Sequence, residues 1–218
     1  MNKDNSYSSL KDIAYNSILE DILSHDYLTG DVLNEKKLVE KYGYSKTPIR
    51  EALLSLCNDG VLRNIPRYGY EIIRVTKEDV KDMLQFRYIL ETGVLKLNLS
   101  KFTEIQIKKL SDINSNCSKS ENGLWDHWDL NTDFHVKMLS FSHNTYAVNE
   151  LRRCMDKLKR AYAQLYWYNL EVSTFTSDTR HHKNILSALE NKDLPALLLS
   201  LKHDIEDFGG LNAFDLDI

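Results

Sequence analysis

The chain has 218 residues, which allows one large domain or two smaller domains that each bury a core. Its formal net charge is −4 at pH 7, which excludes a protein that attracts nucleic acid over its whole surface. The three cysteines, Cys57, Cys117 and Cys154, are widely spaced and form no CxxC pair, which indicates reduced structural thiols of a cytosolic protein.

The sequence contains neither a signal peptide nor a membrane-spanning segment that we can recognise. Residues 1–9 are polar and lack the charged and apolar regions of a secretory signal peptide. No apolar run approaches the length that crosses a bilayer. We therefore expect a cytoplasmic protein without a membrane partner.

Two short helices are predicted between residues 34 and 60. The first covers residues 34–43, begins at a capping asparagine and ends in a turn at Gly43. The second is predicted to end at Asn58, Asp59 and Gly60, where glycine can adopt the left-handed conformation. Two short helices that meet across Gly43 and Tyr44 have the spacing of a helix-turn-helix.

The start of the second helix is the most informative stretch of the chain. We expect Thr47 to cap it, Pro48 to occupy its first position and Glu51 to lie in its first turn. Lys46 and Arg50 are left pointing outward. The inward stripe recurs at i, i+3, i+4 and i+7 and consists of Ile49, Ala52, Leu53 and Leu56.

A hairpin is predicted after this helix. Residues 61–65 and 70–75 are rich in β-branched and aromatic residues, and the turn Pro66-Arg67-Tyr68-Gly69 joins them. Basic charge is concentrated here, since residues 36–74 hold eight Lys and Arg against four Asp and Glu. A helix-turn-helix followed by such a hairpin is a winged helix, and its local charge suits a focused contact with DNA.

These segments resemble the GntR-type bacterial transcription regulators over most of residues 10–75. The resemblance implies that Lys46, Thr47 and Arg50 contact base edges or phosphates, and that Arg67 and Gly69 approach the minor groove or the backbone. The chain has Lys46 where the family usually has Arg, which replaces a bidentate fork with a point charge. The residues that match are Leu33-x-Glu35, Leu38, Gly43, Ser45 to Leu53, Leu56, Gly60 and Pro66 to Gly69.

The pattern becomes helical after residue 75. Thr76 can cap a new helix, and we place a domain boundary at residues 74–77. The predicted fold is therefore mainly α, with a winged helix-turn-helix in residues 1–75 and a helical bundle in residues 76–218. The six predicted helices of the bundle cover residues 77–99, 103–119, 124–142, 145–171, 175–191 and 193–207.

This second half resembles the FCD effector domain of the FadR-like GntR branch. The resemblance implies a dimerisation domain that binds a small organic carboxylate. It also implies a divalent metal held by an Asp, a His four residues later and two further His, with an Arg nearby. The matching segments are Glu78-Asp79-Val80, Phe86-Arg87-x-x-Leu90-Glu91, Phe134-His135 and His182-x-x-Ile185-x-x-Ala188-Leu189-x-x-x-Asp193.

Helical periodicity places Arg87 among apolar neighbours on its helix, where an arginine needs an anion. One candidate anion is Glu91, one turn away, and the other is the carboxylate of a bound ligand. The two are not exclusive. Together with the resemblance, this leads us to expect that Arg87, Asn131, His135 and His182 line the ligand site.

The metal ligands that we expect are Asn131, His135, His182 and Asp204. Asn131 stands where the family has its Asp, and Asp204 stands where the family usually has its last His. His203 is the alternative if the phase of the last helix differs. Such nitrogen and oxygen ligands suit zinc, nickel or manganese, although these residues can also be ordinary polar residues of a core or surface.

The expected function is a ligand-responsive regulator that binds a palindromic operator as a homodimer, because two-fold proteins read two-fold sites. One alternative is a metal-dependent enzyme with a winged-helix appendage. The chain has no HExxH, phosphate-binding glycine loop or nucleophile motif, so we do not expect an enzyme. The other alternative is a winged helix used for protein contacts only.

Overall fold

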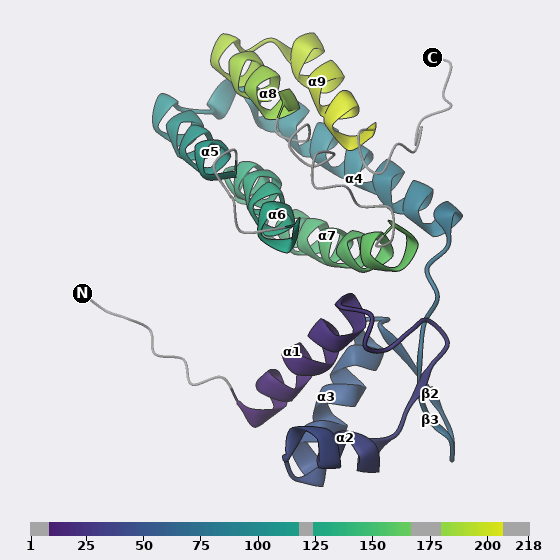
Figure 1. The fold of residues 1–218 in the computed structure, drawn as a ribbon. Helices are drawn as coiled ribbons and strands as arrows, with labels where there is room; N and C mark the ends of the chain where they lie inside the picture. The colour runs from purple at the N-terminus through teal and green to yellow at the C-terminus, as the bar shows by residue number, and fades with distance from the viewer. Residues whose placement is uncertain (1–8, 118–123, 167–179, 207–218) are drawn as a thin grey trace, which may run out of the picture. The chain divides into compact units, whose positions relative to one another are not determined.

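The computed structural model describes residues 9–117, 124–166 and 180–206. The chain divides into two compact units, Met1–Val75 and Thr76–Ile218 (Figure 1). None of the described helices is both long and apolar enough to span a bilayer.

The first unit is a winged helix-turn-helix, as the sequence predicts. Its sheet has the order β1-β3-β2 and is antiparallel throughout, with Val32 opposite Glu71 and Leu62 opposite Ile72. α1 packs against α3, and the core between the helices and the sheet is apolar. In chain order the elements are α1 (Leu10–Leu23), β1 (Val32–Leu33), α2 (Glu35–Tyr42), α3 (Lys46–Asn58), β2 (Leu62–Ile65) and β3 (Gly69–Ile72).

α1 and β1 are the two elements for which the sequence pattern gave no prediction. Ser9 and Asp12 form a capping box at the start of α1, which satisfies backbone N–H groups that have no partner inside the helix. The buried residues Ala14, Ile18 and Ile22 follow at intervals of four, so one face of α1 enters the core.

The start of α3 differs from the prediction. Its N-cap is Ser45, whose side chain makes no capping hydrogen bond, and the helix begins at Lys46. Thr47 therefore lies inside the first turn, and the prediction that it caps the helix is wrong. Pro48 is the third helical residue, where its missing N–H is still one of the groups without an intrahelical partner. Glu51 lies beyond the first turn, which contains no acidic residue.

The second unit contains the six predicted helices in the described residues. Thr76 and Asp79 form a capping box at the first of them. Residues 167–171 and 175–179, which the sequence also predicts as helical, lie outside the described residues. The helices are α4 (Lys77–Asn98), α5 (Glu104–Cys117), α6 (Leu124–Ser140), α7 (Thr145–Tyr166), α8 (Arg180–Asn191) and α9 (Leu194–Glu206), with a 3-10 turn, η1 (Leu99–Lys101), after α4.

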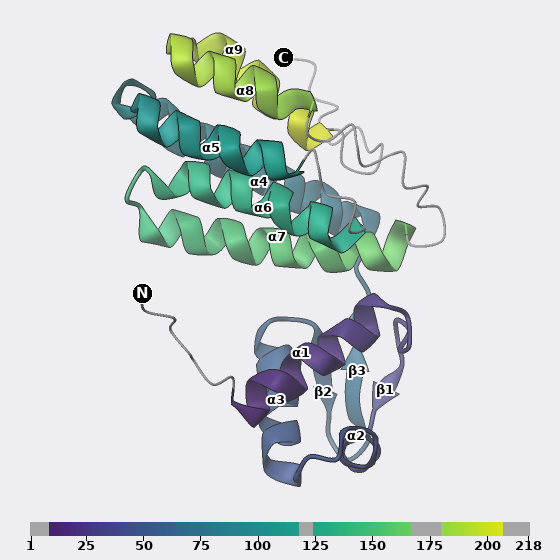
Figure 2. The ribbon, with the colours of Figure 1, turned by 60° about the vertical axis from the view of Figure 1, so that its left-hand side comes forward.

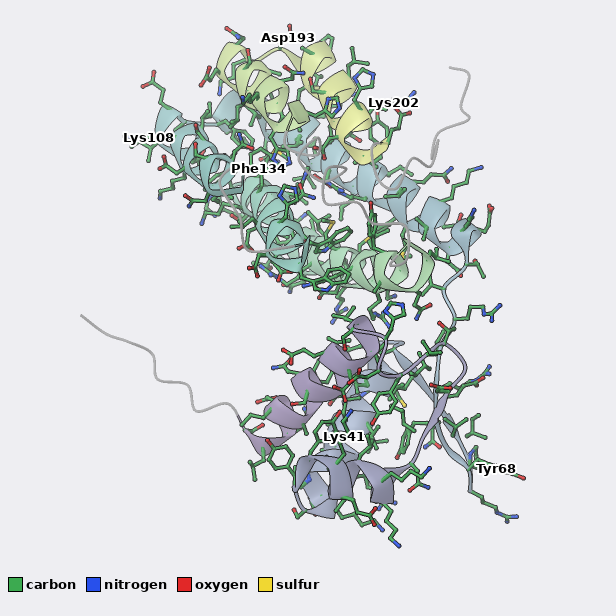
Figure 3. All side chains as sticks on the ribbon, in the orientation of Figure 1. Lys41, Tyr68, Lys108, Phe134, Asp193 and Lys202 are labelled. Atoms are coloured by element: carbon green, nitrogen blue, oxygen red, sulfur yellow. The ribbon has the colours of Figure 1, made fainter. Side chains whose placement is uncertain are left out.

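The helices of this unit pack side by side around one core (Figure 2). α4 contacts α6, α7 and α9, while α5 contacts α6 and α8, and α8 contacts α9. Phe134 on α6 is fully buried at the centre and stacks on the ring of His182, with ring centroids 3.9 Å apart (Figure 3). α6 and α8 therefore meet at Phe134, whose ring contacts the rings of His135 and His182.

Substitution of Gly69 tests how closely β1 approaches β3 in the sheet. Its φ is +138°, and a Cβ atom there would lie 2.4 Å from the carbonyl oxygen of Leu33 on β1. Gly60 has a φ of +67°, but a Cβ there would meet nothing within 4 Å. We expect Gly60→Ala to lower the free energy of unfolding by about 1–2 kcal/mol from backbone strain alone. Gly69→Ala adds a steric clash and should cost more in urea unfolding; equal costs would contradict the close approach of β1.

Candidate nucleic-acid interface and buried ionic cluster

The outward face of α3 is cationic and open to solvent. The side chains of Lys46 and Arg50 are 72% and 60% exposed, and Thr47 beside them is also exposed. The opposite face of the helix is fully buried through Ile49, Ala52, Leu53 and Leu56. α3 is therefore anchored on one side and presents two positive charges on the other.

Glu35, the first residue of α2, pairs with both of these cations. Its carboxylate lies 3.4 Å from Lys46 Nζ and 3.4 Å from Arg50 Nε, and its own side chain is only 17% exposed. The two pairs link α2 to α3 across the turn and orient the cationic side chains. The role of Glu35 was not predicted from the sequence, because the two pairs depend on how α2 and α3 face each other.

The tip of the hairpin projects from the sheet (Figure 3). Arg67 is exposed and has a φ of +71°, and Tyr68 next to it is 75% exposed. Gly69 is half-buried, and the space that a side chain would need there is taken by β1. Glycine at this position is therefore required by the sheet itself.

The helical unit contains a buried cluster of five ionisable side chains. Arg87 and Glu91 come from α4, His135 from α6, His182 from α8 and Asp204 from α9. All five are buried, with at most 9% of each residue exposed. Helices that are distant in the sequence thus contribute charges to one point of the core, where ions are costly unless they are paired.

Arg87 is held by two carboxylates. Its Nε donates to Glu91 Oε1 at 2.6 Å, and its Nη2 donates to Asp204 Oδ2 at 3.2 Å. Of the two anions that the sequence offered for Arg87, the internal one is therefore present, and Asp204 is a further partner that the sequence analysis did not assign to it.

The carboxylates in turn hold the two histidines. Glu91 Oε2 is 2.8 Å from His135 Nδ1, and Asp204 Oδ2 is 3.0 Å from His135 Nε2. Asp204 Oδ1 is 3.4 Å from His182 Nε2, and the two Nε2 atoms are 3.2 Å apart. Asp204 is thus the one residue of the cluster that contacts Arg87 and both histidines.

The pKa values follow from burial and from these charges. Burial raises the pKa of Glu91 and Asp204, but nearby positive charges outweigh burial and leave both pKa values below normal. Burial and Arg87 lower the pKa of His135, yet the two carboxylates outweigh them and raise it. Burial lowers the pKa of His182 to about 3, so its imidazole is neutral at pH 7.

The outer nitrogen of each histidine is fixed by a partner away from the cluster centre. His182 Nδ1 lies 3.1 Å from Asn114 Oδ1, so Nδ1 carries the proton and Nε2 is an acceptor. His135 Nδ1 likewise donates to Glu91. Both Nε2 atoms and a carboxylate oxygen of Asp204 therefore point to one place, and these three ligand atoms lie within 4.8 Å of one another.

The donor set fits a divalent metal. Two imidazole nitrogens and a carboxylate, with acceptors behind the imidazoles, are the ligands and the supporting hydrogen bonds that zinc and similar ions use, and a bound ion would replace the proton on His135 Nε2. Asn131 lies one turn before His135 on α6, and its Oδ1 is buried without a hydrogen-bond partner among the described residues. That buried oxygen gives a fourth ligand candidate.

The structure distinguishes the two residues of α9, Asp204 and His203, that the sequence offers as the last metal ligand. Asp204 is buried in the cluster, while His203 is exposed and its ring lies 5.7 Å from that of His181. Asn114 and the contact between Glu91 and His135 were missed by sequence reasoning. Neither could be found from helical periodicity, because both depend on how separate helices face each other.

Two family models match the chain. Residues 10–72 match the model described as "Bacterial regulatory proteins, gntR family", and residues 82–206 match the FCD domain. The boundary between the two compact units lies between these matches.

The relatives are regulators as well. The Bacillus subtilis protein described as "Uncharacterized HTH-type transcriptional regulator YdhC" is 28% identical over 199 residues, which is 88% of each chain. The Escherichia coli HTH-type transcriptional repressor RspR is 22% identical over 88% of this chain and 84% of its own. Among solved structures, E. coli McbR/YncC has a TM-score of 0.73 at 20% identity and covers 91% of this chain and 94% of its own. The two family models and the first two of these proteins describe regulators, so the metal-dependent enzyme is not supported.

Removing one charge from the cluster tests its energetics. Glu91→Gln leaves Arg87 and His135 to share one buried carboxylate, that of Asp204, and we expect the free energy of unfolding to fall by about 3 kcal/mol. The matched control is Glu150→Gln, because Glu150 pairs with the exposed Arg153 at 2.9 Å. That change should cost less than about 1 kcal/mol. Similar costs for both variants in urea unfolding would contradict the role given to Glu91.

Proposed function

The chain belongs to the GntR family of bacterial regulatory proteins and carries an FCD domain, and from this premise we propose a ligand-responsive regulator that binds a palindromic operator as a homodimer. The coarser statement, a DNA-binding transcription regulator, follows from the family. The observation that carries the DNA contact is the cationic, exposed face of α3 opposite its buried face, and the buried cluster supports the response to a ligand.

The proposed DNA contacts divide into two groups. Lys46, Thr47 and Arg50 enter the major groove from the first turns of α3, where their side chains reach base edges or phosphates. Arg67 and Gly69 approach the minor groove or the backbone from the tip of the hairpin. One short reading helix specifies few base pairs, which favours a homodimer with two copies on a palindrome. Such a regulator works in the cytoplasm with the chromosome.

The proposed effector site is the buried cluster. His135, His182 and Asp204 would hold a divalent metal, zinc, nickel or manganese, with Asn131 as a further ligand. The ion would supply a positive centre that attracts a ligand oxygen. His135 and His182 are supported for this role by Glu91 and Asn114, which keep their Nδ1 atoms protonated and their Nε2 atoms directed inward.

The proposed effector is a small organic carboxylate that binds at Arg87. Two donors of Arg87 are already used by Glu91 and Asp204, while its Nη1 forms no hydrogen bond within the described residues. An acid that enters must share the guanidinium with Asp204 or displace it. Because Asp204 belongs to α9, displacement would change the contact between α9 and α4, and coupling to DNA requires such a difference between two states.

Arg50→Ala tests the reading role of α3. We expect affinity for a duplex selected by this protein from a random library to fall by about 1–3 kcal/mol, because one groove contact is lost. The matched control is Arg153→Ala, since Arg153 is also exposed, at 74% against 60% for Arg50, but lies in the helical unit. A gel-shift titration measures both, and circular dichroism verifies folding. Unchanged affinity for Arg50→Ala would remove Arg50 from the reading role.

Thermal unfolding of chelator-treated protein tests the metal. Added zinc, nickel or manganese at 100 times its dissociation constant should stabilise the protein by about 2.7 kcal/mol through mass action. His182→Ala should abolish this effect, whereas His203→Ala at the exposed neighbouring turn should retain it. Small carboxylates are then screened with and without the ion. Equal stabilisation of both variants would place the metal outside the cluster.

A further inference from the structure

Two histidines lie outside the buried cluster, and each is next in sequence to one of its members. His181 precedes His182 on α8, and His203 precedes Asp204 on α9. The two helices lie side by side (Figures 1 and 2). The rings of His181 and His203 have centroids 5.7 Å apart, with 52° between their planes. We call these two residues the outer pair.

The outer pair is nearer to solvent than the cluster. His203 is exposed and His181 is half-buried. His135 and His182 are fully buried, whereas Asp204 is 9% exposed, the most of the three proposed metal ligands. Asp204 is also the residue that follows His203 in the chain. The part of the cluster nearest to solvent therefore adjoins the outer pair.

Access is a physical problem for a metal site of this kind. A divalent ion is strongly hydrated, and a charge that enters a protein core without water or new ligands is very costly. Stepwise exchange of water for protein ligands avoids a bare ion in the core, so a metal site needs an entry path. Ligands at the surface, next to the final ones, would provide the first step of such a path.

The geometry of the outer pair suits a reversible contact with a metal ion. Imidazole nitrogens bind zinc at about 2.0–2.1 Å, which places the centroids of two rings on one ion about 5–6 Å apart. The 5.7 Å of the outer pair falls in this range. Among the described residues, no further His, Cys, Asp or Glu completes a group of three ligands with the pair. Water would occupy the other positions, so the pair would hold an ion weakly and release it.

We propose that the outer pair is a capture site for a divalent transition metal, which then passes to Asp204 and the buried histidines. The inference rests on the metal site of the proposed function and names its entry path. The step is an exchange of ligands, in which the outer imidazoles release the ion as Asp204 and His182 bind it. His135 Nε2 gives its proton to solvent and becomes the next ligand. No covalent bond of the chain other than this N–H bond changes.

The rate of zinc uptake tests the capture role. Metal-free protein is mixed with zinc and a fluorescent zinc indicator, whose signal gives both the uptake rate and the dissociation constant. His203→Asn should slow uptake at least about 5-fold and leave the dissociation constant unchanged, because a ligand used only in passing changes both rate constants equally. The matched control is His143→Asn, since His143 is also exposed but lies between α6 and α7. Its φ of +57° suits asparagine.

A second substitution tests whether the two imidazoles act together. His181→Asn should slow uptake to a similar degree, and the double variant should be no slower than either single variant, because all three lose the same site. Slowing that multiplies in the double variant would indicate two independent contacts and overturn the shared site. Manganese prefers oxygen ligands, so its uptake should be unchanged in His203→Asn. Equal slowing of manganese and zinc would indicate altered opening of the helices and overturn capture by imidazole.

Failure of this proposal is distinguishable from failure of the proposed metal site. Unchanged zinc uptake in both single variants, with zinc still bound, removes the capture site and leaves the cluster as the metal site. A dissociation constant that His203→Asn raises by about 10-fold or more would make His203 a permanent ligand, which also overturns capture. A wild-type protein that binds no zinc, or a His182→Ala variant that binds zinc as tightly as wild type, overturns both.

Discussion

The burial of Arg87 is the constraint on which the helical unit depends. A guanidinium keeps its charge at any pH that the protein meets, so the core around it must contain anions. Glu91 and Asp204 supply them, and their surplus negative charge is balanced by His135. The requirement of one side chain thereby joins α4, α6 and α9 through ion pairs, and it brings His182 of α8 to the same point.

The sequence predicted the elements well where their signals are local. Thr76 predicts the start of α4, because a capping box involves only four consecutive residues. The buried faces of the helices from α3 to α9 are predicted by apolar residues that recur with the helical period of 3.6. β1 has two residues, and its partner strand is some forty residues later, so no local pattern reveals it. The prediction that Thr47 caps α3 was wrong because the helix begins two residues earlier than expected. Ser45 is the last residue with extended backbone angles, and Lys46 is already helical.

The candidate site was predictable in part for the same reason. Helical phase placed His182 inward and separated Asp204 from His203, because each decision concerns one helix. The contacts of Glu91 with His135, and of Asn114 with His182, join different helices. They depend on the axial positions of those helices, which periodicity does not contain. The resemblance supplied the candidate ligand positions, and the structure supplied the hydrogen bonds that orient their side chains.

The ion pairs of Glu35 with Lys46 and Arg50 affect how strongly the protein binds DNA of random sequence. By lying 3.4 Å from Lys46 and Arg50, Glu35 cancels part of the positive charge that α3 offers to any phosphate chain. Attraction to random sequence comes almost entirely from displaced counterions, so this cancellation weakens loose attachment everywhere. In the proposed operator complex, base contacts of the two cations would offset the lost pairs. In that proposed complex a single carboxylate would lower the affinity for random DNA more than the affinity for the operator, so fewer molecules would remain bound to other sequences.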